Sequence, residues 1–429
     1  MIKQNISFIL IFLFLSKVGY TLESPRRIGK TALNSWEHHR KLALNETPYE
    51  ASKSYPDFSS VGALVSTDGL IGTATLISPK LAVSSAHIVK NSFNDYPDPK
   101  DWTFTLADDF ERATQETKYK ISSFRIHPTW IIRQTSNLPL GDGDLLGVDL
   151  VLVSLEKAVV GIKPARLPFL KQELIGLNLF HIGFGSLVDG VEGEVDSSNS
   201  KKYAGRNILD RSIESIPVEG VREEEWGGIL AFDFDSHLND SNALGADQPI
   251  IDNLGTGTSS PFPVSLESST AVGDSGAPCF LRTENAWRVH GVVSYGSDDS
   301  TYGDVTIFTR LLSHMSWLRE SLPSWSNAQM VGIGNWRKYD WFGAFLPYEN
   351  GWNFHYEFGW FYSTAQSDDE VWFWIDGMNW LWTSFVYYPY LYSNELKGWI
   401  YVDPDQSRFS NFTYFSYDSY SWSSLQSNQ

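Results

Sequence analysis

The hydrophobic positions of the chain fall into short runs. From about Ser59 onward, apolar segments such as VGALVS, IGTATLIS and LAVSSAHIV are separated by Gly, Pro and Asp. Short apolar runs between turn-forming residues are typical of β-strands, so the pattern predicts an all-β barrel or sandwich. Similar runs recur as far as VTIFTRL, and only residues 311–322 have the apolar spacing of a helix.

The composition changes after Pro323, where aromatic residues become frequent. Trp341, Trp360, Trp380 and Trp399 recur 19 or 20 residues apart in the similar contexts DWFG, GWFY, NWLW and GWIY. Turn-forming residues lie between aromatic-alternating arms, which predicts one β-hairpin per unit and a short array of hairpins over residues 331–403. Such rings either form the core of the hairpins or project as stacking platforms for sugars or peptides, and core packing is favoured.

Four flanking segments complete the predicted organisation. Residues 1–20 have a charged start followed by ISFILIFLFL, a run too short to cross a bilayer, which predicts a signal peptide. Secretion to the exterior or the cell surface is expected, with the periplasm as an alternative and no transmembrane segment after cleavage. Residues 21–54 predict a propeptide or loose arm and residues 323–330 a linker, whereas the Ser- and Tyr-rich residues 404–429 either close the array or remain mobile.

Charge and cysteine content narrow the range of partners. The 429 residues allow two or three domains, and 33 basic against 51 acidic side chains give a net charge of −18. Such a field repels nucleic acid and anionic membranes, so neither is expected as a partner. Cys279 is the only cysteine of the chain, which excludes an intramolecular disulfide. Its apolar surroundings predict a buried hydrophobic residue rather than a reactive thiol.

Three segments carry candidate chemistry. His87 lies in GTATLISPKLAVSSAHIV, Asp149 in GVDLVLVSLEKAV and Ser275 in AVGDSGAPCFL. A base, an acid that orients it and an alcohol are the groups that acyl transfer by serine requires. Asp142 and Asp144 compete for the role of the acid, but they lack the apolar strand that follows Asp149.

The order His, Asp, Ser and these three contexts resemble the trypsin/chymotrypsin family of serine peptidases. The resemblance covers residues 55–322. It implies a fold of two six-stranded β-barrels with a short C-terminal helix, in which the triad lies between the barrels. The stretch GRNILD, residues 205–210, resembles certain bacterial members, in keeping with a disulfide-free, bacterial-type chain. The departures from the family pattern are Ser85 for Ala, Ile88 for Cys, Ala277 for Gly, and a long insert over residues 186–269.

The resemblance also implies roles around the triad. The backbone N–H groups of Gly273 and Ser275 are expected to form an oxyanion hole. Ser294 is expected to support Asp149 and, with Gly296, to offer an edge strand to the substrate. Ser269 at the floor of the substrate pocket and Thr306 on its wall imply a preference for small or medium uncharged side chains.

Activation and metal binding stay open at this point. Family members often insert a freed N-terminal amine beside the acid that corresponds to Asp274. Cleavage after Arg27 would free Ile28, but this bond lies far upstream of the first strand, and activation without insertion is an equal alternative.

A separate acidic segment suggests a metal site only weakly. Its oxygen ligands are of the kind that calcium uses, although a solvated acidic loop is favoured and no other metal or cofactor is expected. The residues concerned are Asp233, Asp235, Asn239 and Asp240.

Taken together, these features predict a secreted serine endopeptidase acting on protein or peptide substrates through an acyl-enzyme. Residues 331–403 are expected to attach it to a polysaccharide or the cell envelope. The alternative is a catalytically silent protease-fold scaffold that acts in surface binding or adhesion.

Overall fold

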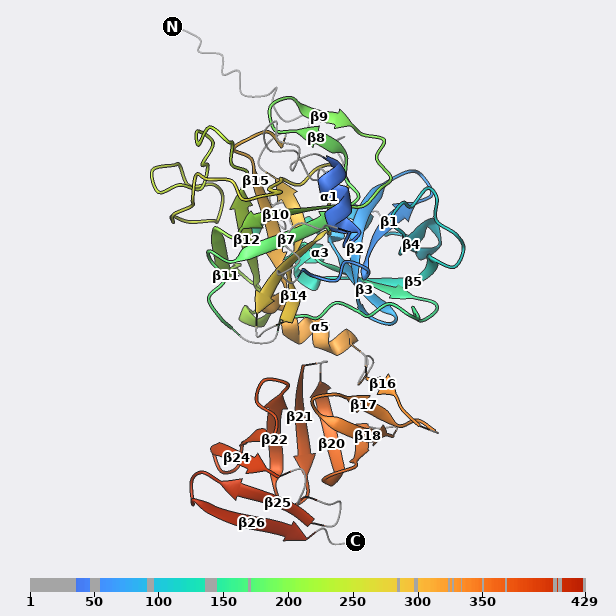
Figure 1. Cartoon of the computed structure of the whole chain (residues 1–429), viewed down its shortest axis with the longest axis vertical. Helices are drawn as coiled ribbons and strands as arrows, with labels where there is room; N and C mark the ends of the chain where they lie inside the picture. The colour runs from blue at the N-terminus through green and yellow to red at the C-terminus, as the bar shows by residue number, and fades with distance from the viewer. Residues whose placement is uncertain are drawn as a thin grey trace, which may run out of the picture. The chain divides into compact units, whose positions relative to one another are not determined.

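The chain divides into two compact units, the first lying mainly before Ser313 and the second mainly from His314 onward. Strands dominate both, and Figure 1 colours the first unit from blue to orange and the sheet of the second in orange and red. No helix among the described residues is long and apolar enough to cross a membrane. The computed structural model describes residues 36–46, 55–90, 96–135, 145–168, 171–283, 286–296, 300–322, 325, 328–332, 334–348, 351–366, 369–403, 407 and 411–426. The expected signal peptide, residues 1–20, therefore lies outside the described residues.

Six strands of the first unit close into a barrel. Antiparallel pairing follows the order β1-β2-β3-β6-β5-β4, and β4 pairs again with β1. Val, Ile, Leu and Ala are frequent in these strands, and their burial fills the interior of the barrel with side chains. The strands are β1 (Val61–Ser66), β2 (Ile71–Ser78), β3 (Leu81–Ser84), β4 (Trp102–Thr105), β5 (Lys118–Ile126) and β6 (Val151–Leu155).

A second sheet of seven strands completes the first unit, in the order β10-β7-β13-β14-β15-β12-β11. The strands are β7 (Asn178–Gly183), β10 (Tyr203–Ile208), β11 (Arg211–Ile216), β12 (Gly227–Asp233), β13 (Pro278–Thr283), β14 (Ala286–Gly296) and β15 (Val305–Arg310), and a separate hairpin is formed by β8 (Leu187–Asp189) and β9 (Gly193–Asp196).

A second closed barrel was expected, but in the described part of the chain no strand pairing joins the two edge strands of this sheet, β10 and β11. The chain passes directly from β10 to β11, but Leu209 N–H donates to Leu177 while Asp210 N–H donates to Ala231. The backbone thus changes partner between these two residues instead of pairing β10 with β11.

In the part of the chain that the structure describes, four α-helices accompany the sheets, and only the region of α5 was expected from the sequence. Residues 36–43, part of the segment expected to be a propeptide or loose arm, form α1. Leu42 and Ala43 are buried, and His39 Nδ1 lies 2.8 Å from the carbonyl oxygen of Ala204. A single amphipathic turn or two is too short to give a clear helical period, so α1 and α3 were missed. The helices are α1 (Trp36–Ala43), α2 (Ala86–Val89), α3 (Pro128–Thr135) and α5 (Met315–Ser321).

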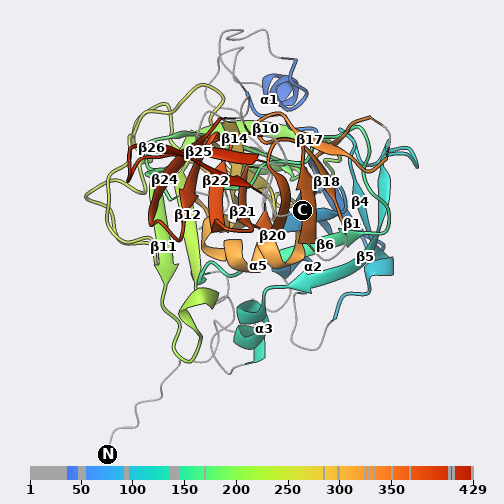
Figure 2. The same ribbon diagram turned by 90° about the horizontal axis from the view of Figure 1, so that it is seen from below.

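The second unit is built on an eleven-stranded antiparallel sheet in which the strands follow one another from β16 to β26. Figure 2 shows its central strands β20, β21 and β22 side by side. Helix α5 groups with this sheet, and Arg319 of α5 forms an ion pair with Glu370. The strands are β16 (Gln329–Met330), β17 (Arg337–Tyr339), β18 (Gly343–Pro347), β19 (Trp352–His355), β20 (Gly359–Gln366), β21 (Glu370–Ile375), β22 (Asn379–Ser384), β23 (Tyr390–Ser393), β24 (Gly398–Val402), β25 (Asn411–Ser416) and β26 (Ser421–Gln426).

The four repeated tryptophans do not share one environment. Trp341 lies in a turn and packs against the buried core formed by Phe342 and its neighbours. Trp360, Trp380 and Trp399 each occupy the second position of a strand, and Trp360 and Trp399 are 51% and 36% exposed. The favoured interpretation as core residues is therefore wrong for the exposed pair, because strand alternation turns them to the outer face.

Candidate functional site

The three candidate catalytic side chains lie in one hydrogen-bonded row. Nδ1 of His87 lies 2.6 Å from Oδ2 of Asp149, and Nε2 of His87 lies 2.8 Å from Oγ of Ser275. A carboxylate only accepts, so Nδ1–H donates to Asp149 and Nε2 is left to accept from the hydroxyl. Asp149 and Ser275 are fully buried and His87 is 8% exposed. The competing residues Asp142 and Asp144 lie outside the described residues.

Each side chain is positioned by the element on which it lies. His87 belongs to the one-turn helix α2, and its backbone N–H donates to Oδ1 of Asp149 at 3.0 Å. Asp149 precedes β6, and its carbonyl oxygen accepts from Oγ1 of Thr309 at 3.1 Å. Ser294 lies at a register shift between β14 and β15, and its hydroxyl donates to Oδ2 of Asp149 at 2.7 Å. The carboxylate therefore accepts three bonds, which offset the cost of burying it.

Ile88 fills the space beside Gly72 on β2. A Cβ at Gly72 would lie 2.6 Å from Cδ1 of Ile88, so the two residues are in close contact. Apolar packing thus joins α2 to β2 at the position where the family resemblance expects a cysteine.

Ser275 lies in a tight turn, the Ser275 turn (residues 271–277), whose peptide groups have fixed directions. The carbonyl of Val272 accepts from Ser186 N–H at 2.7 Å, and the carbonyl of Asp274 accepts from Ala277 N–H at 2.8 Å. Carbonyl and N–H point in opposite directions across a trans peptide. The N–H groups of Gly273 and Ser275 therefore point away from the N–H groups of Ser186 and Ala277, which bind those two carbonyls.

Glycine is required at position 273 of this turn. Gly273 has φ +103°, and a Cβ there would lie 2.9 Å from Cα of Gly185. A side chain would both strain the backbone and clash with the facing chain.

The buried carboxylate of Asp274 also stabilises the Ser275 turn. Oδ1 accepts from Gly185 N–H and Oδ2 from Ala271 N–H, each at 3.0 Å. A Cβ at Gly183 would lie only 1.9 Å from Oδ1, so this carboxylate needs a glycine beside it. Arg27 and Ile28, the candidate activation bond, lie outside the described residues.

Three of the four residues expected to form the substrate pocket lie on the paired strands β14 and β15, and Ser269 lies in the loop before the Ser275 turn. Ser269, Ser294 and Thr306 are almost fully buried, and Gly296 of β14 pairs with Thr306 of β15. Oγ1 of Thr306 lies 2.9 Å from Oγ1 of Thr270, a residue that the sequence did not single out. The hydroxyl of Thr306, the residue expected on the pocket wall, is thus paired with that of Thr270.

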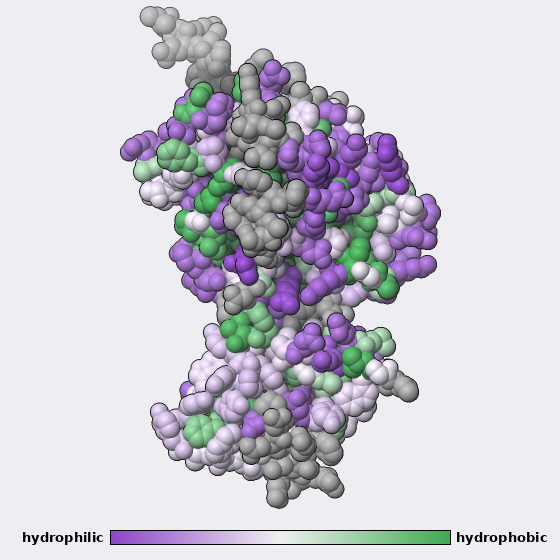
Figure 3. Space-filling model, viewed as in Figure 1, coloured by the Kyte–Doolittle hydropathy of each residue, from purple (hydrophilic) through white to green (hydrophobic). Residues whose placement is uncertain are grey.

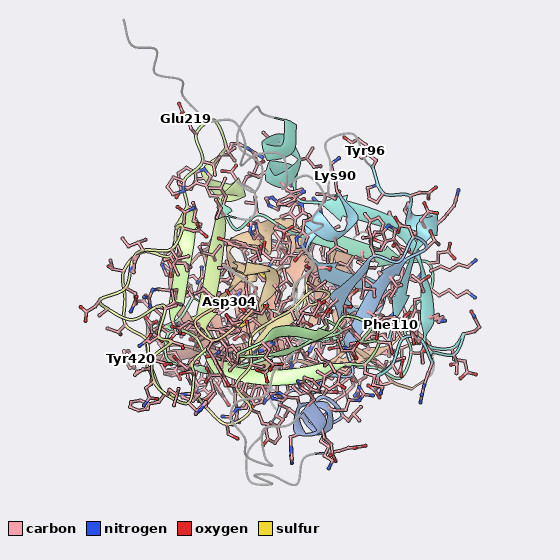
Figure 4. The ribbon with its side chains drawn as sticks, turned by 90° about the horizontal axis from the view of Figure 1, so that it is seen from above. Lys90, Tyr96, Phe110, Glu219, Asp304 and Tyr420 are labelled. Carbon is pink, nitrogen blue, oxygen red and sulfur yellow. The ribbon has the colours of Figure 1, made fainter. Side chains whose placement is uncertain are left out.

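A cation–π contact lies directly after α2. The ammonium of Lys90 is 4.1 Å from the centre of the Tyr96 ring, and Figure 4 labels both residues. Such a contact between an ammonium group and an aromatic ring is attractive.

The first unit contains a cluster of buried carboxylates. Burial, together with the charge of Asp233, raises the pKa of Asp210 and of Asp235 to about 8, and burial raises the pKa of Glu267 well above its ordinary value. Glu267 accepts from the N–H groups of Asp235 and Val264.

This cluster differs from the calcium site that the sequence weakly suggested. Asp233 accepts from Leu244 N–H and the Ser259 hydroxyl, whereas Asp240 bonds Ser236 and Ser241. Within the described part of the chain, no group of three or more His, Cys, Asp or Glu side chains is arranged to hold a metal ion.

Cys279 is fully buried on β13, and burial raises the pKa of its thiol. Its strand position opposite His181 leaves it inside the core.

Comparison with known proteins gives a partial similarity. The chain is 39% identical over 57 residues to chymotrypsin-C of Mus musculus, and the aligned segment is 13% of this chain and 21% of that protein. No family model matches the chain. This local similarity suggests a trypsin-like fold, in agreement with the closed six-stranded barrel.

Proposed function

We propose that the chain is a secreted serine endopeptidase that hydrolyses protein or peptide substrates through an acyl-enzyme. The observation that supports this best is the row of hydrogen bonds from Ser294 through Asp149 and His87 to Ser275. It supplies the alcohol with a base and the base with an orienting acid, the arrangement that makes serine nucleophilic. The local similarity to chymotrypsin-C agrees with it.

In the proposed reaction, Oγ of Ser275 attacks the carbonyl carbon of the scissile peptide while Nε2 of His87 takes its proton. The N–H groups of Gly273 and Ser275 stabilise the charge that develops on the carbonyl oxygen. His87 then gives the proton to the leaving amine, the C–N bond breaks and an acyl group remains on Ser275. A water molecule, deprotonated by His87, attacks the acyl carbon, releasing the acid and restoring the serine.

Labelling with a fluorophosphonate tests the proposal against the alternative of a silent scaffold. One label per chain is expected on Ser275 and none in Ser275→Ala, because only an activated alcohol reacts at a useful rate. Ser60→Ala is the matched control, since Ser60 is a buried serine of the same unit whose hydroxyl has no partner in the described structure, and it should label normally. A correctly folded chain that takes up no label would instead support the scaffold.

The proposed specificity is for small or medium uncharged side chains. Ser269 brings no carboxylate to the pocket floor, and the hydroxyls of Thr270 and Thr306 take up room on its wall. Digestion of a peptide library should therefore give cleavage after such residues. Cleavage strictly after Arg or Lys would refute the pocket assignment while leaving the triad untouched.

We also propose that the second unit attaches the enzyme to a neutral polysaccharide through an outer aromatic face. Strand register aligns aromatic side chains across consecutive strands, while their chain neighbours Phe361, Phe373 and Leu381 are fully buried on the opposite face. One row crosses β19–β22 and the other β21–β24. The face comprises Trp352, Tyr362, Trp374 and Trp380 in the first row and Trp372, Trp382, Tyr392 and Trp399 in the second.

Charge and repetition favour a neutral polymer as the occupant of this face. Residues 323–429 contain four basic and eleven acidic side chains, so polyanions are repelled. The surface over β21, β22 and β24 is pale in Figure 3, neither strongly hydrophilic nor strongly hydrophobic, as amphipathic Trp and Tyr rings make it. Repeated shallow contacts gain affinity when the ligand repeats as well, as the sugars of a polysaccharide do.

Co-sedimentation of the full-length Ser275→Ala chain with microcrystalline cellulose and with chitin tests this attachment. Trp399→Ala should lower the apparent affinity about three- to tenfold by removing one stacking ring. Tyr420→Ala is the control, because Tyr420 is 80% exposed but lies in the turn before β26. This role of the face would be ruled out if the chain bound neither cellulose nor chitin. It would also be ruled out if Trp399→Ala and Tyr420→Ala lowered the apparent affinity equally.

A further inference from the structure

Thr73 of β2 contacts the Ser275 turn at two positions. Its backbone N–H donates to the carbonyl of Ser275 at 2.8 Å, and its hydroxyl donates to the carbonyl of Gly273 at 3.1 Å. The same hydroxyl accepts from Phe184 N–H at 3.3 Å. A single buried threonine thus joins the turn to two other segments of the chain.

We infer that Thr73 is a positioning residue that stabilises the oxyanion-binding form of the Ser275 turn, an inference that rests on the proposed peptidase function. The Thr73 hydroxyl binds the carbonyl of the peptide that joins Gly273 to Asp274, and the N–H of that peptide donates to Ala271 at 2.8 Å. Both ends of this peptide group are therefore held. Its rotation would also turn the neighbouring N–H groups of Gly273 and Ser275.

The surroundings of Thr73 allow little freedom for a substitute interaction. Its carbonyl accepts from the Ser84 hydroxyl at 2.6 Å, and a Cβ at Gly276 would lie 2.2 Å from that carbonyl oxygen. The backbone of β2 and the turn are thus already in close contact. A substitution confined to the Thr73 side chain therefore tests its hydroxyl bond apart from these backbone contacts.

Thr75 provides a matched control on the same strand. Thr73 and Thr75 are both fully buried, but the hydroxyl of Thr75 has no hydrogen-bond partner in the described structure. Replacing either threonine with valine keeps the shape and removes only the hydroxyl. The two variants therefore separate the bond to the turn from the general effect of losing a buried polar group.

Steady-state kinetics of the full chain on a peptide substrate test the inference. Thr73→Val should lower kcat about tenfold with little change in KM, because the bond stabilises the geometry of the transition state more than substrate binding. Thr73→Ser should restore kcat and Thr75→Val should leave it unchanged. Affinity for a peptide trifluoromethyl ketone, which forms a tetrahedral adduct, should fall with kcat.

The outcomes distinguish this inference from the proposed function. Equal kcat in Thr73→Val and Thr75→Val would overturn the role of Thr73 in an active enzyme, whereas an inactive wild-type chain would count against the peptidase itself. If Thr73→Val does not fold, Thr73→Ala and Thr75→Ala make the same comparison. A loss in Thr73→Ala that matches the loss in Thr75→Ala would again overturn the inference.

Discussion

Replacing Asp149 with asparagine is expected to lower kcat for peptide hydrolysis about 10⁴-fold. In the native chain Asp149 accepts from Nδ1–H of His87, so Nε2 can accept the proton of Ser275. The amide of asparagine can donate to Nδ1 instead. The imidazole would then carry its proton on Nε2, facing Ser275, where it cannot act as a base.

Asp196→Asn is the charge-matched control for this experiment. Asp196 is an exposed carboxylate of the same unit whose oxygen accepts from Ser198. Its loss changes the net charge as Asp149→Asn does, and kcat should stay within about twofold. Both variants are compared by single-turnover kinetics and by the rate of fluorophosphonate labelling. A loss below tenfold in Asp149→Asn would mean that the carboxylate does not orient His87.

The sequence singled out His87, Asp149 and Ser275 as candidates because each lies in a local context with its own pattern. His87 follows an apolar strand, Asp149 precedes one, and Ser275 lies between glycines at a tight turn. Thr73 had no such signal. A threonine inside a strand is ordinary, and its importance depends on which distant turn the fold brings against it.

The carboxylate cluster, like Thr73, could not be recognised from the sequence. Asp210, Asp233 and Glu267 come from separate segments: pairing of β11 with β12 brings Asp210 to Asp233, and the N–H of Asp235, just after β12, donates to Glu267. Spacing in the sequence instead grouped Asp233 and Asp235 with Asn239 and Asp240. The strand order of a sheet formed by residues far apart in the chain cannot be obtained from local patterns.

Alternation identified the strands of the second unit but not which aromatic residues face outward. Trp341 and Trp360 have similar neighbours, yet the first lies in a turn and the second in β20. A shift of one position between turn and strand reverses the face to which a side chain points.

The free energy of unfolding of the first unit is expected to fall as pH rises from about 6.5 to 8. Asp210 and Asp235 have folded-state pKa values of about 8, raised mainly by burial, and burial also raises the pKa of Glu267. In the unfolded chain these groups ionise near pH 4. Between these values the folded chain binds more protons than the unfolded chain, so each added pH unit favours unfolding.

Other buried groups define the limits of this window. Burial lowers the pKa of His181 and of His290 to about 3, so below about pH 6.5 the unfolded chain gains protons at these histidines and their effect opposes that of the carboxylates. Burial lowers the pKa of Lys202 to about 8, and above that pH the lysine also acts in the opposite direction. From 6.5 to 8 the carboxylates therefore dominate.

Denaturant unfolding of the full chain at pH 6.5 and at pH 8 measures the effect. Each carboxylate that stays protonated contributes on the order of 1 kcal/mol over this interval, so the midpoint denaturant concentration should be lower at pH 8 than at pH 6.5. Asp235→Asn should flatten the dependence. Asp235 has one buried oxygen without a partner in the described structure, so an amide can replace its neutral acid.

Asp240→Asn is the control for this dependence, since Asp240 is exposed and its pKa is lowered by bonds from Ser236 and Ser241. Its stabilising effect is present above its unfolded pKa and is lost only as pH falls through the lower folded value, far below 6.5. The control variant should keep the wild-type slope. If both variants keep it, Asp235 is already ionised at pH 6.5 and does not contribute to the dependence. The comparison thus tests whether the buried side chain of Asp235 is neutral at pH 6.5.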